Sequence, residues 1–307
     1  MQPIKGILLK LCAVVLFIIM ASLIKAVSDV VPPGEAVFFR SLLAIPVILT
    51  WLWWRGDLRT GLKASSKASH FWRGLVGTVA MGLGFAGLGL LPLPEVTALG
   101  YAAPLLTVVF AAMFLNEKVG IFRISAVGLG FSGVLIVLSP RLTALGDEAL
   151  QAAQALGAVL VLMSAVCAAL AQIYIRKMVA TEQTSAIVFY FSLTSTLLSL
   201  LTIPFGWVWP APWALACLVL AGLIGGTAQI FLTSAYRFAD ASVVAPFDYA
   251  SMIFALIIGY MVFNEVPTLS MLGGAALIIL AGLIIILREH YLGLKRGQAR
   301  AVKTPQG

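Results

Sequence analysis

Long apolar runs recur along the chain and leave it little choice of fold. Ten can be counted, at approximately 6–27, 35–54, 71–91, 95–115, 120–138, 155–175, 184–205, 213–235, 242–263 and 267–287. Each run has about the 20 residues that a helix needs to cross a hydrocarbon core roughly 30 Å thick. Inside lipid a lone span must satisfy its own backbone hydrogen bonds, so each run is predicted to be a helix.

Composition excludes a soluble fold. Hydrophobic residues make up 61% of the 307 residues and charged residues 10%, against about 25% charged in a typical soluble domain. A soluble chain of this length needs a polar surface that this composition cannot supply. A transmembrane barrel is disfavoured, because its strands alternate in short segments of about ten residues. The predicted class is therefore an all-α polytopic membrane protein with ten transmembrane helices.

The distribution of Lys and Arg predicts how these helices are oriented. With the N-terminus in the cytoplasm, 17 of the 20 basic residues fall on the cytoplasmic side, and only Lys25, Arg40 and Arg141 do not. Positive charge concentrates on the cytoplasmic side of membrane proteins, so both termini are expected there. These orientation signals account for the net charge of +8, and no nucleic-acid partner is predicted.

A duplicated stretch indicates how the helices are grouped. Pro94–Glu117 returns at Ser242–Glu265, an offset of 148 residues, with Tyr101 matching Tyr249 and an Asn-Glu pair closing each copy. At the same offset, Gly74, Gly77 and Ala80 match Gly222, Gly225 and Ala228. Ten helices then form two halves of five, and an odd number inverts the second half in the membrane. Inverted repeats are a common plan of secondary transporters.

The chain is accordingly divided into four segments. These are a first five-helix repeat at 1–138, a more polar linker at 139–154, a second five-helix repeat at 155–290 and a basic cytoplasmic tail at 291–307. The tail is rich in small and polar residues and is expected to be disordered.

Two charged residues lie deep inside apolar runs. Arg40 is placed about five residues into the second run, where a charge costs about 2.5–3.5 kcal/mol on insertion scales, so a cavity and a partner are expected. It either binds an anionic group or holds an outer gate; the alternative is a side chain that reaches back to the interface. Asp248 is a candidate for proton coupling or for a cationic group, and the alternative is a structural pair with a basic or hydroxyl group.

Uncharged polar residues complete the candidate site. Tyr101, Tyr190, Tyr249 and Gln229 are predicted to line a cavity with Arg40 and Asp248; for the tyrosines the alternative is aromatic packing in the core. Pro46, Pro104 and Pro246 should interrupt the hydrogen bonding of their helices. Lys25, Glu35 and Glu95 are expected to be solvated at helix ends. Glu117 and Glu265 are expected to end their helices and shape the hairpins that follow.

Enzyme motifs are not supported by their context. Two GxGxxG patterns, at 82–87 and 128–133, lie inside apolar runs, where close helix packing explains them. Cys12, Cys167 and Cys217 match no disulfide or metal spacing. No catalytic residue, cofactor or metal site is predicted, since an intramembrane enzyme would need a second catalytic group near Asp248.

The chain combines the ten runs, the two halves, the FFRSLLA motif around Arg40, and the FLNE and FNEVPT motifs that close the fourth and ninth runs. With these features it resembles the EamA-type branch of the drug/metabolite transporter superfamily. The resemblance covers about 6–287. It implies eight helices around a central cavity, runs five and ten as a peripheral pair, and transport by alternating access without ATP. The chain departs from the family pattern at Met252, where the second proline is displaced to Pro246, and in having Asn before each closing Glu.

The expected function is that of a secondary carrier for a small polar or amphipathic organic solute. It would lie among lipids in a bacterial cytoplasmic (inner) membrane, with a proton as the candidate coupling ion. A channel or an accessory membrane subunit is the alternative. Among carriers, the resemblance is compatible with riboflavin or S-adenosylmethionine uptake and with amino-acid or drug export. The oligomeric state stays open.

Overall fold

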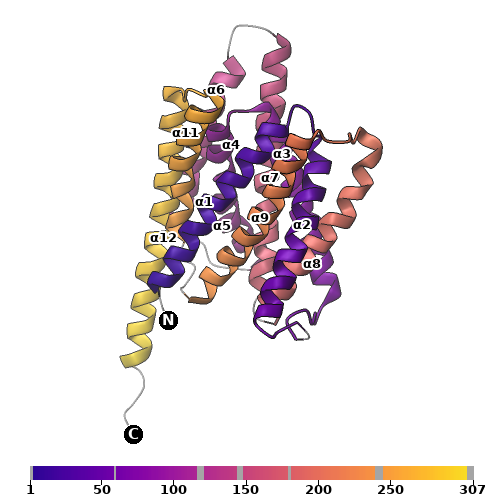
Figure 1. Cartoon of the computed structure of the whole chain (residues 1–307). Coiled ribbons are helices and arrows are strands. Elements are labelled where there is room, and N and C mark those ends of the chain that lie inside the picture. The colour runs from indigo at the N-terminus through magenta and orange to yellow at the C-terminus, as the bar shows by residue number, and fades with distance from the viewer. Residues whose placement is uncertain are drawn as a thin grey trace.

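The chain folds into a bundle of long helices (Figure 1). The computed structural model describes residues 3–58, 60–115, 121–143, 148–178, 181–238 and 245–302. The first half holds α1 (Pro3–Val27), α2 (Pro33–Trp54), α3 (Lys67–Leu90), α4 (Leu93–Gly100), α5 (Ala102–Leu115) and α6 (Ile121–Thr143). The second holds α7 (Glu148–Met178), α8 (Thr184–Ser199), η1 (Leu200–Phe205), α9 (Pro212–Phe238), η2 (Ala245–Tyr249), α11 (Ala250–Phe263) and α12 (Leu269–Val302).

The predicted class of fold is confirmed. Within the described residues, nine helical segments are long and apolar enough to cross a membrane, and a shorter apolar helix covers Ile124–Pro140. Together they correspond to the ten predicted runs. The start of α1 and the end of α12 lie at the same end of the bundle (Figure 1), as an even number of spans requires. That end is called the terminal end below.

Two repeat-related spans are interrupted, as their prolines predicted. The span before the first hairpin is divided into α4 and α5 at Tyr101. Pro104 has no N–H to donate to the Gly100 carbonyl, so the helical ladder cannot continue through this point. The second copy passes from the 3-10 turn η2 into α11 just after Tyr249. By contrast, α2 continues through Pro46.

Helices of the two halves pack against each other throughout the bundle. α1 lies along α9, α3 lies along α7, and α2 lies between α8 and α9. α6 packs along α12, where Gly133 and Gly274 leave room for each other's backbone: a Cβ on Gly133 would lie 2.7 Å from the Gly274 carbonyl oxygen. The close approach of these two helices agrees with the peripheral pair that the resemblance implies.

The linker and the tail contain more helix than expected. α6 continues to Thr143 and α7 begins at Glu148, so helix ends occupy much of the linker at 139–154. α12 continues to Val302, and the expectation of a disordered tail is wrong for residues 291–302. This stretch has no proline and is rich in Leu, Ala, Lys, Arg and Gln, which favour helices.

Candidate functional site

Two buried arginines meet at one aromatic ring inside the bundle. Arg40 lies on α2 and Arg73 on α3, and only 3% and 7% of their surfaces are exposed. Their guanidinium carbons lie 5.6 Å and 3.7 Å from the centre of the Phe191 ring on α8. The Nε and Nη1 atoms of both arginines are buried and have no hydrogen-bond partner among the described residues. Arg40 therefore does not reach back to the interface, and two guanidinium groups keep unused donors.

An ion pair with one buried partner joins the two halves nearer the terminal end. The Lys10 Nζ atom on α1 lies 2.6 Å from the Oδ1 atom of Asp248 in η2. The Lys10 side chain is 2% exposed and that of Asp248 is 42% exposed. Asp248 therefore has a basic partner, Lys10, as expected if it forms a structural pair. Its greater exposure leaves the carboxylate accessible from one side.

Tyr101 and Tyr249 pack against each other where the two interrupted spans cross. Their ring centres are 4.9 Å apart in an edge-on arrangement, and both residues are 7% exposed. The Tyr101 hydroxyl lies 2.5 Å from the Ser251 Oγ atom. The Tyr249 hydroxyl lies against Gly282 of α12, where any Cβ would collide with it. Both rings belong to the packed core, beside Asp248.

Gln229 lies on the same side of α9 as Gly225, the residue of this helix that contacts Arg40. A Cβ on Gly225 would lie 3.3 Å from the Arg40 Nε atom, and Gln229 follows Gly225 by four residues, about one helical turn. The Gln229 side chain is half-buried. Gln229 is therefore placed to face the same interior region as Arg40.

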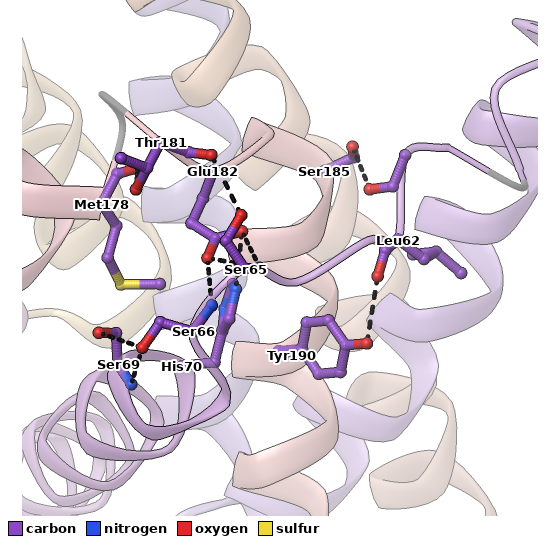
Figure 2. A network of polar contacts seen from close by, with 11 residues as sticks. Leu62, Ser65, Ser66, Ser69, His70, Met178, Thr181, Glu182, Ser185 and Tyr190 are labelled. Carbon is purple, nitrogen blue, oxygen red and sulfur yellow. Dashed lines mark hydrogen bonds and ion pairs between the residues drawn. The ribbon is translucent and has the colours of Figure 1, made fainter.

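Tyr190 is drawn away from this region towards the terminal end. Its hydroxyl donates a hydrogen bond of 3.1 Å to the Leu62 carbonyl, and its ring centre lies 4.8 Å from that of His70 (Figure 2). The six predicted residues thus fall into three places. Arg40 and Gln229 share one, Asp248 and the two other tyrosines share the second, and Tyr190 occupies the third.

The Glu182 carboxylate holds the α2–α3 loop at the terminal end (Figure 2). It accepts backbone hydrogen bonds from Ser65 at 2.8 Å and Ser66 at 2.8 Å, just before α3 begins, and lies 3.4 Å from the His70 Nε2 atom. His70 is buried with this carboxylate. Desolvation raises the pKa of Glu182, but these N–H donors and His70 together lower it further, so the net pKa is below the usual 4.5.

The stabilisation contributed by Glu182 should therefore be lost in acid. A carboxylate whose pKa is lower in the folded protein stabilises it fully above the unfolded pKa, and this contribution declines as the pH falls through the folded pKa. We expect Glu182→Gln to lower the melting temperature near neutral pH and the difference from wild type to shrink below pH 4.5. Asp57→Asn, at an exposed carboxylate, is the control. A difference that grows in acid would contradict this assignment.

The opposite end of the bundle is tied by two further carboxylates. Lys25 donates to the Leu88 and Leu91 carbonyls at 3.0 Å and 2.7 Å and lies 3.0 Å from a Glu265 oxygen. Glu35 accepts from the Val208 N–H at 3.1 Å. Glu35 and Glu95 are 1% and 7% exposed. The expectation that Lys25, Glu35 and Glu95 are solvated is wrong, because helix packing turns them inwards. Glu265 does more than shape a hairpin, since it pairs with Lys25. Glu117 lies outside the described residues.

A hollow of about 660 Å³ lies apart from all these charges. It is mostly apolar, lies between α1, α2 and α9 and includes Pro46, Thr227 and Phe231 in its lining, but none of the six predicted residues. Its volume alone does not make it the site. The buried and unpartnered donors of Arg40 and Arg73 are the stronger indication.

Lys10 and Arg73 are the functional candidates that sequence reasoning missed. Their charges are assigned to the cytoplasmic flanks, yet both positions fall inside predicted apolar runs, at 6–27 and 71–91. A charge inside an apolar run was therefore the signal that could have identified both residues. Phe191 gave none, because one aromatic residue in an apolar helix is ordinary.

Comparison with known proteins gives a consistent result. The model of the EamA-like transporter family matches residues 4–139 and 155–288. An S-adenosylmethionine uptake transporter of Rickettsia felis is 30% identical over 255 residues, which cover 83% of each chain. The pseudopaline exporter of Pseudomonas aeruginosa is 30% identical over 284 residues, covering 90% of this chain and 94% of its own.

Two further matches extend the comparison. A riboflavin transporter of Rhizobium johnstonii is 30% identical over 263 residues, covering 84% of this chain and 82% of its own. A solved crystal structure superposes with a TM-score of 0.65 at 20% identity, over 91% of this chain and 96% of that one. This last likeness shows the fold.

Proposed function

The chain belongs to the EamA-like transporter family, and from that premise we propose that it is a secondary carrier that moves a small polar or amphipathic organic solute by alternating access, without ATP hydrolysis. Its family and relatives are transporters rather than enzymes. It is a multi-pass protein of the bacterial inner membrane.

The observation that carries the proposal is the reciprocal packing of the two halves. α1 lies along α9, and its counterpart α7 lies along α3. α2 packs on α9, and its counterpart α8 packs on α3. This exchange supports an inverted repeat of 1–138 and 155–290, an architecture in which one half rocks against the other around a site between them.

Two carboxylates at similar repeat positions support the same arrangement. Glu35, at the start of α2, accepts from Val208 before α9. Glu182, just before α8, accepts from Ser65 before α3. Each half therefore holds the other at one end of the bundle, and alternating access would release these ends in turn.

The predicted site residues take roles within this carrier. Arg40 binds an anionic group of the solute or holds a gate, and Gln229 lines the same region. Asp248 carries a coupling proton, or pairs with a cationic group, when it separates from Lys10. Tyr101, Tyr190 and Tyr249 line the path that opens as the halves move.

Counterflow into proteoliposomes tests the proposal. Purified protein is reconstituted with unlabelled S-adenosylmethionine, or with riboflavin, inside the vesicles, and the labelled solute is added outside without ATP. These solutes come first because similar proteins are named for them. Saturable uptake driven by the internal solute is expected for at least one solute of these or of a wider metabolite panel.

The alternatives give different results in the same vesicles. A channel would equilibrate the solute without counterflow or saturation. An accessory subunit would move nothing when purified alone. Either outcome across the whole panel would overturn the proposed function.

A further inference from the structure

The Arg40–Arg73 pair is a concentration of positive charge that the surrounding protein does not neutralise. Among the ion pairs of the described residues, none involves either arginine. Both side chains are more than nine-tenths buried. Charged side chains inside membrane-spanning helices usually have a partner or mark a ligand pathway. An anion would supply the partner that neither arginine finds among the described residues.

Phe191 holds the guanidinium groups in a way that suits a carboxylate ligand. The Arg73 guanidinium carbon lies 3.7 Å from the centre of the Phe191 ring, a cation–π contact. Such a contact uses the face of a guanidinium and leaves its in-plane N–H groups available. Those groups form a planar fork that matches the two oxygens of a carboxylate.

Two glycines make room for this arrangement. A Cβ on Gly77 would lie 2.8 Å from the Arg73 Nη1 atom and 2.9 Å from the Phe191 ring. A Cβ on Gly225 would lie 3.3 Å from the Arg40 Nε atom. Gly77 and Gly225 are equivalent positions of the duplicated sequence, at the offset of 148 residues. Each half therefore supplies the space for one arginine.

From these contacts we propose that Arg40 and Arg73 together bind a small organic dianion, with one carboxylate at each guanidinium, beside the Phe191 ring that both arginines contact. The proposal rests on the proposed function, because it names the substrate class of that carrier. A monocarboxylate would leave one positive charge uncompensated in a region shielded from water. A dicarboxylate neutralises both and satisfies the unused Nε and Nη1 donors.

The position of the pair agrees with a substrate site. Arg40 comes from α2, Arg73 from α3 and Phe191 from α8, so the ligand would bridge both halves of the chain. The unused donors are shielded from solvent, so the dianion enters when α8 separates from α2 and α3. A site that closes around its ligand at the interface of two halves is the geometry of alternating access.

Thermal stabilisation of the purified full-length protein tests the dianion site. The melting temperature is measured with succinate, with succinamate and with phosphate, at matched ionic strength. In succinamate a neutral amide replaces one carboxylate. The variants are Arg40→Met and Arg73→Met. Arg55→Met is the matched control, because Arg55 also contacts an aromatic ring, that of Trp51, but is paired with Asp57.

The proposal expects succinate to raise the melting temperature of wild type more than succinamate or phosphate does. Apparent succinate affinity should fall at least tenfold in Arg40→Met and in Arg73→Met and stay unchanged in Arg55→Met. Without any ligand, both site variants should melt no lower than wild type, because each removes an unpaired buried charge. A purely structural role would lower their melting temperatures.

Several results would overturn the proposal. These are no response to succinate, an equal response to succinamate, an equal response to phosphate, and a succinate response that survives in both site variants. If a Met variant does not fold, the corresponding Lys variant replaces it and should also weaken succinate binding, because Lys lacks the planar fork. Counterflow of another solute without succinate binding would reject only the dianion site, whereas succinate binding without counterflow of any solute would reject only the carrier.

Discussion

Replacing Asp248 with Asn should destabilise the folded protein by up to about 3–5 kcal/mol, the cost of removing one partner of a fully buried ion pair. The substitution leaves the Lys10 ammonium, whose side chain is 2% exposed, without the carboxylate that now lies 2.6 Å away. The Lys10 side chain is 2% exposed, so its ammonium gains little hydration in exchange for the lost carboxylate. Chemical denaturation of the purified protein in mild detergent measures the change.

Replacing the other partner of the pair, Lys10, should cost much less. Lys10→Met leaves the Asp248 carboxylate, which is 42% exposed and keeps part of its hydration. The apolar methionine suits the buried position on α1. The double variant Lys10→Met/Asp248→Asn should recover most of the stability lost in Asp248→Asn alone, because both charges of the pair are removed together. If Asp248→Asn is no worse than Lys10→Met, the burial of Lys10 does not govern this pair.

The double variant also separates stability from proton coupling. If Asp248 carries the coupling proton, the refolded double variant should exchange solute by counterflow but no longer respond to a pH gradient that drives wild type. A structural pair would leave the gradient response unchanged. The measurement uses proteoliposomes with the solute that shows counterflow in wild type.

The fold was predictable because its signals are local. Ten apolar runs of spanning length define ten helices, and Pro104 predicts the break at Gly100 because one missing N–H removes one hydrogen bond. Arg40 and Asp248 stood out for the same reason, since a charge within an apolar run is rare and costly. None of these inferences needs to know which helices are neighbours.

The rest of the candidate site depends on which helices touch. Arg73 lies six residues after the start of α3 at Lys67, less than two turns into the helix, and its long side chain could point outwards or inwards. Only the packing of α3 on α8, with Gly77 beside it, directs it to Phe191. The partners of Lys10 and Glu182 likewise lie in the other half of the chain, more than a hundred residues away.

Replacing Lys25 with Met should lower the free energy of unfolding by about 1.5–3 kcal/mol, the range for hydrogen bonds to charged groups. Lys25 caps the end of α3 through the Leu88 and Leu91 carbonyls. Its partner Glu265 accepts the Leu93 N–H at 2.8 Å, where α4 begins. A cation at a helix C-terminus and an anion at an N-terminus are both favourable. The substitution removes the cation and leaves the Glu265 carboxylate without this ion pair, although it keeps the Leu93 hydrogen bond.

A double-mutant cycle isolates the contact between the two side chains. Because Lys25 and Glu265 share one ion pair at 13% and 14% exposure, Lys25→Met and Glu265→Gln together should cost less than the sum of the single variants, by about 0.5–3 kcal/mol. The same cycle on Arg55 and Asp57, both 44% exposed, should give a coupling in the ordinary range of exposed surface pairs, about 0–1 kcal/mol. Equal coupling energies in the two cycles would mean that burial does not strengthen the Lys25–Glu265 ion pair. That ion pair would then not hold the two halves together at the end opposite the termini.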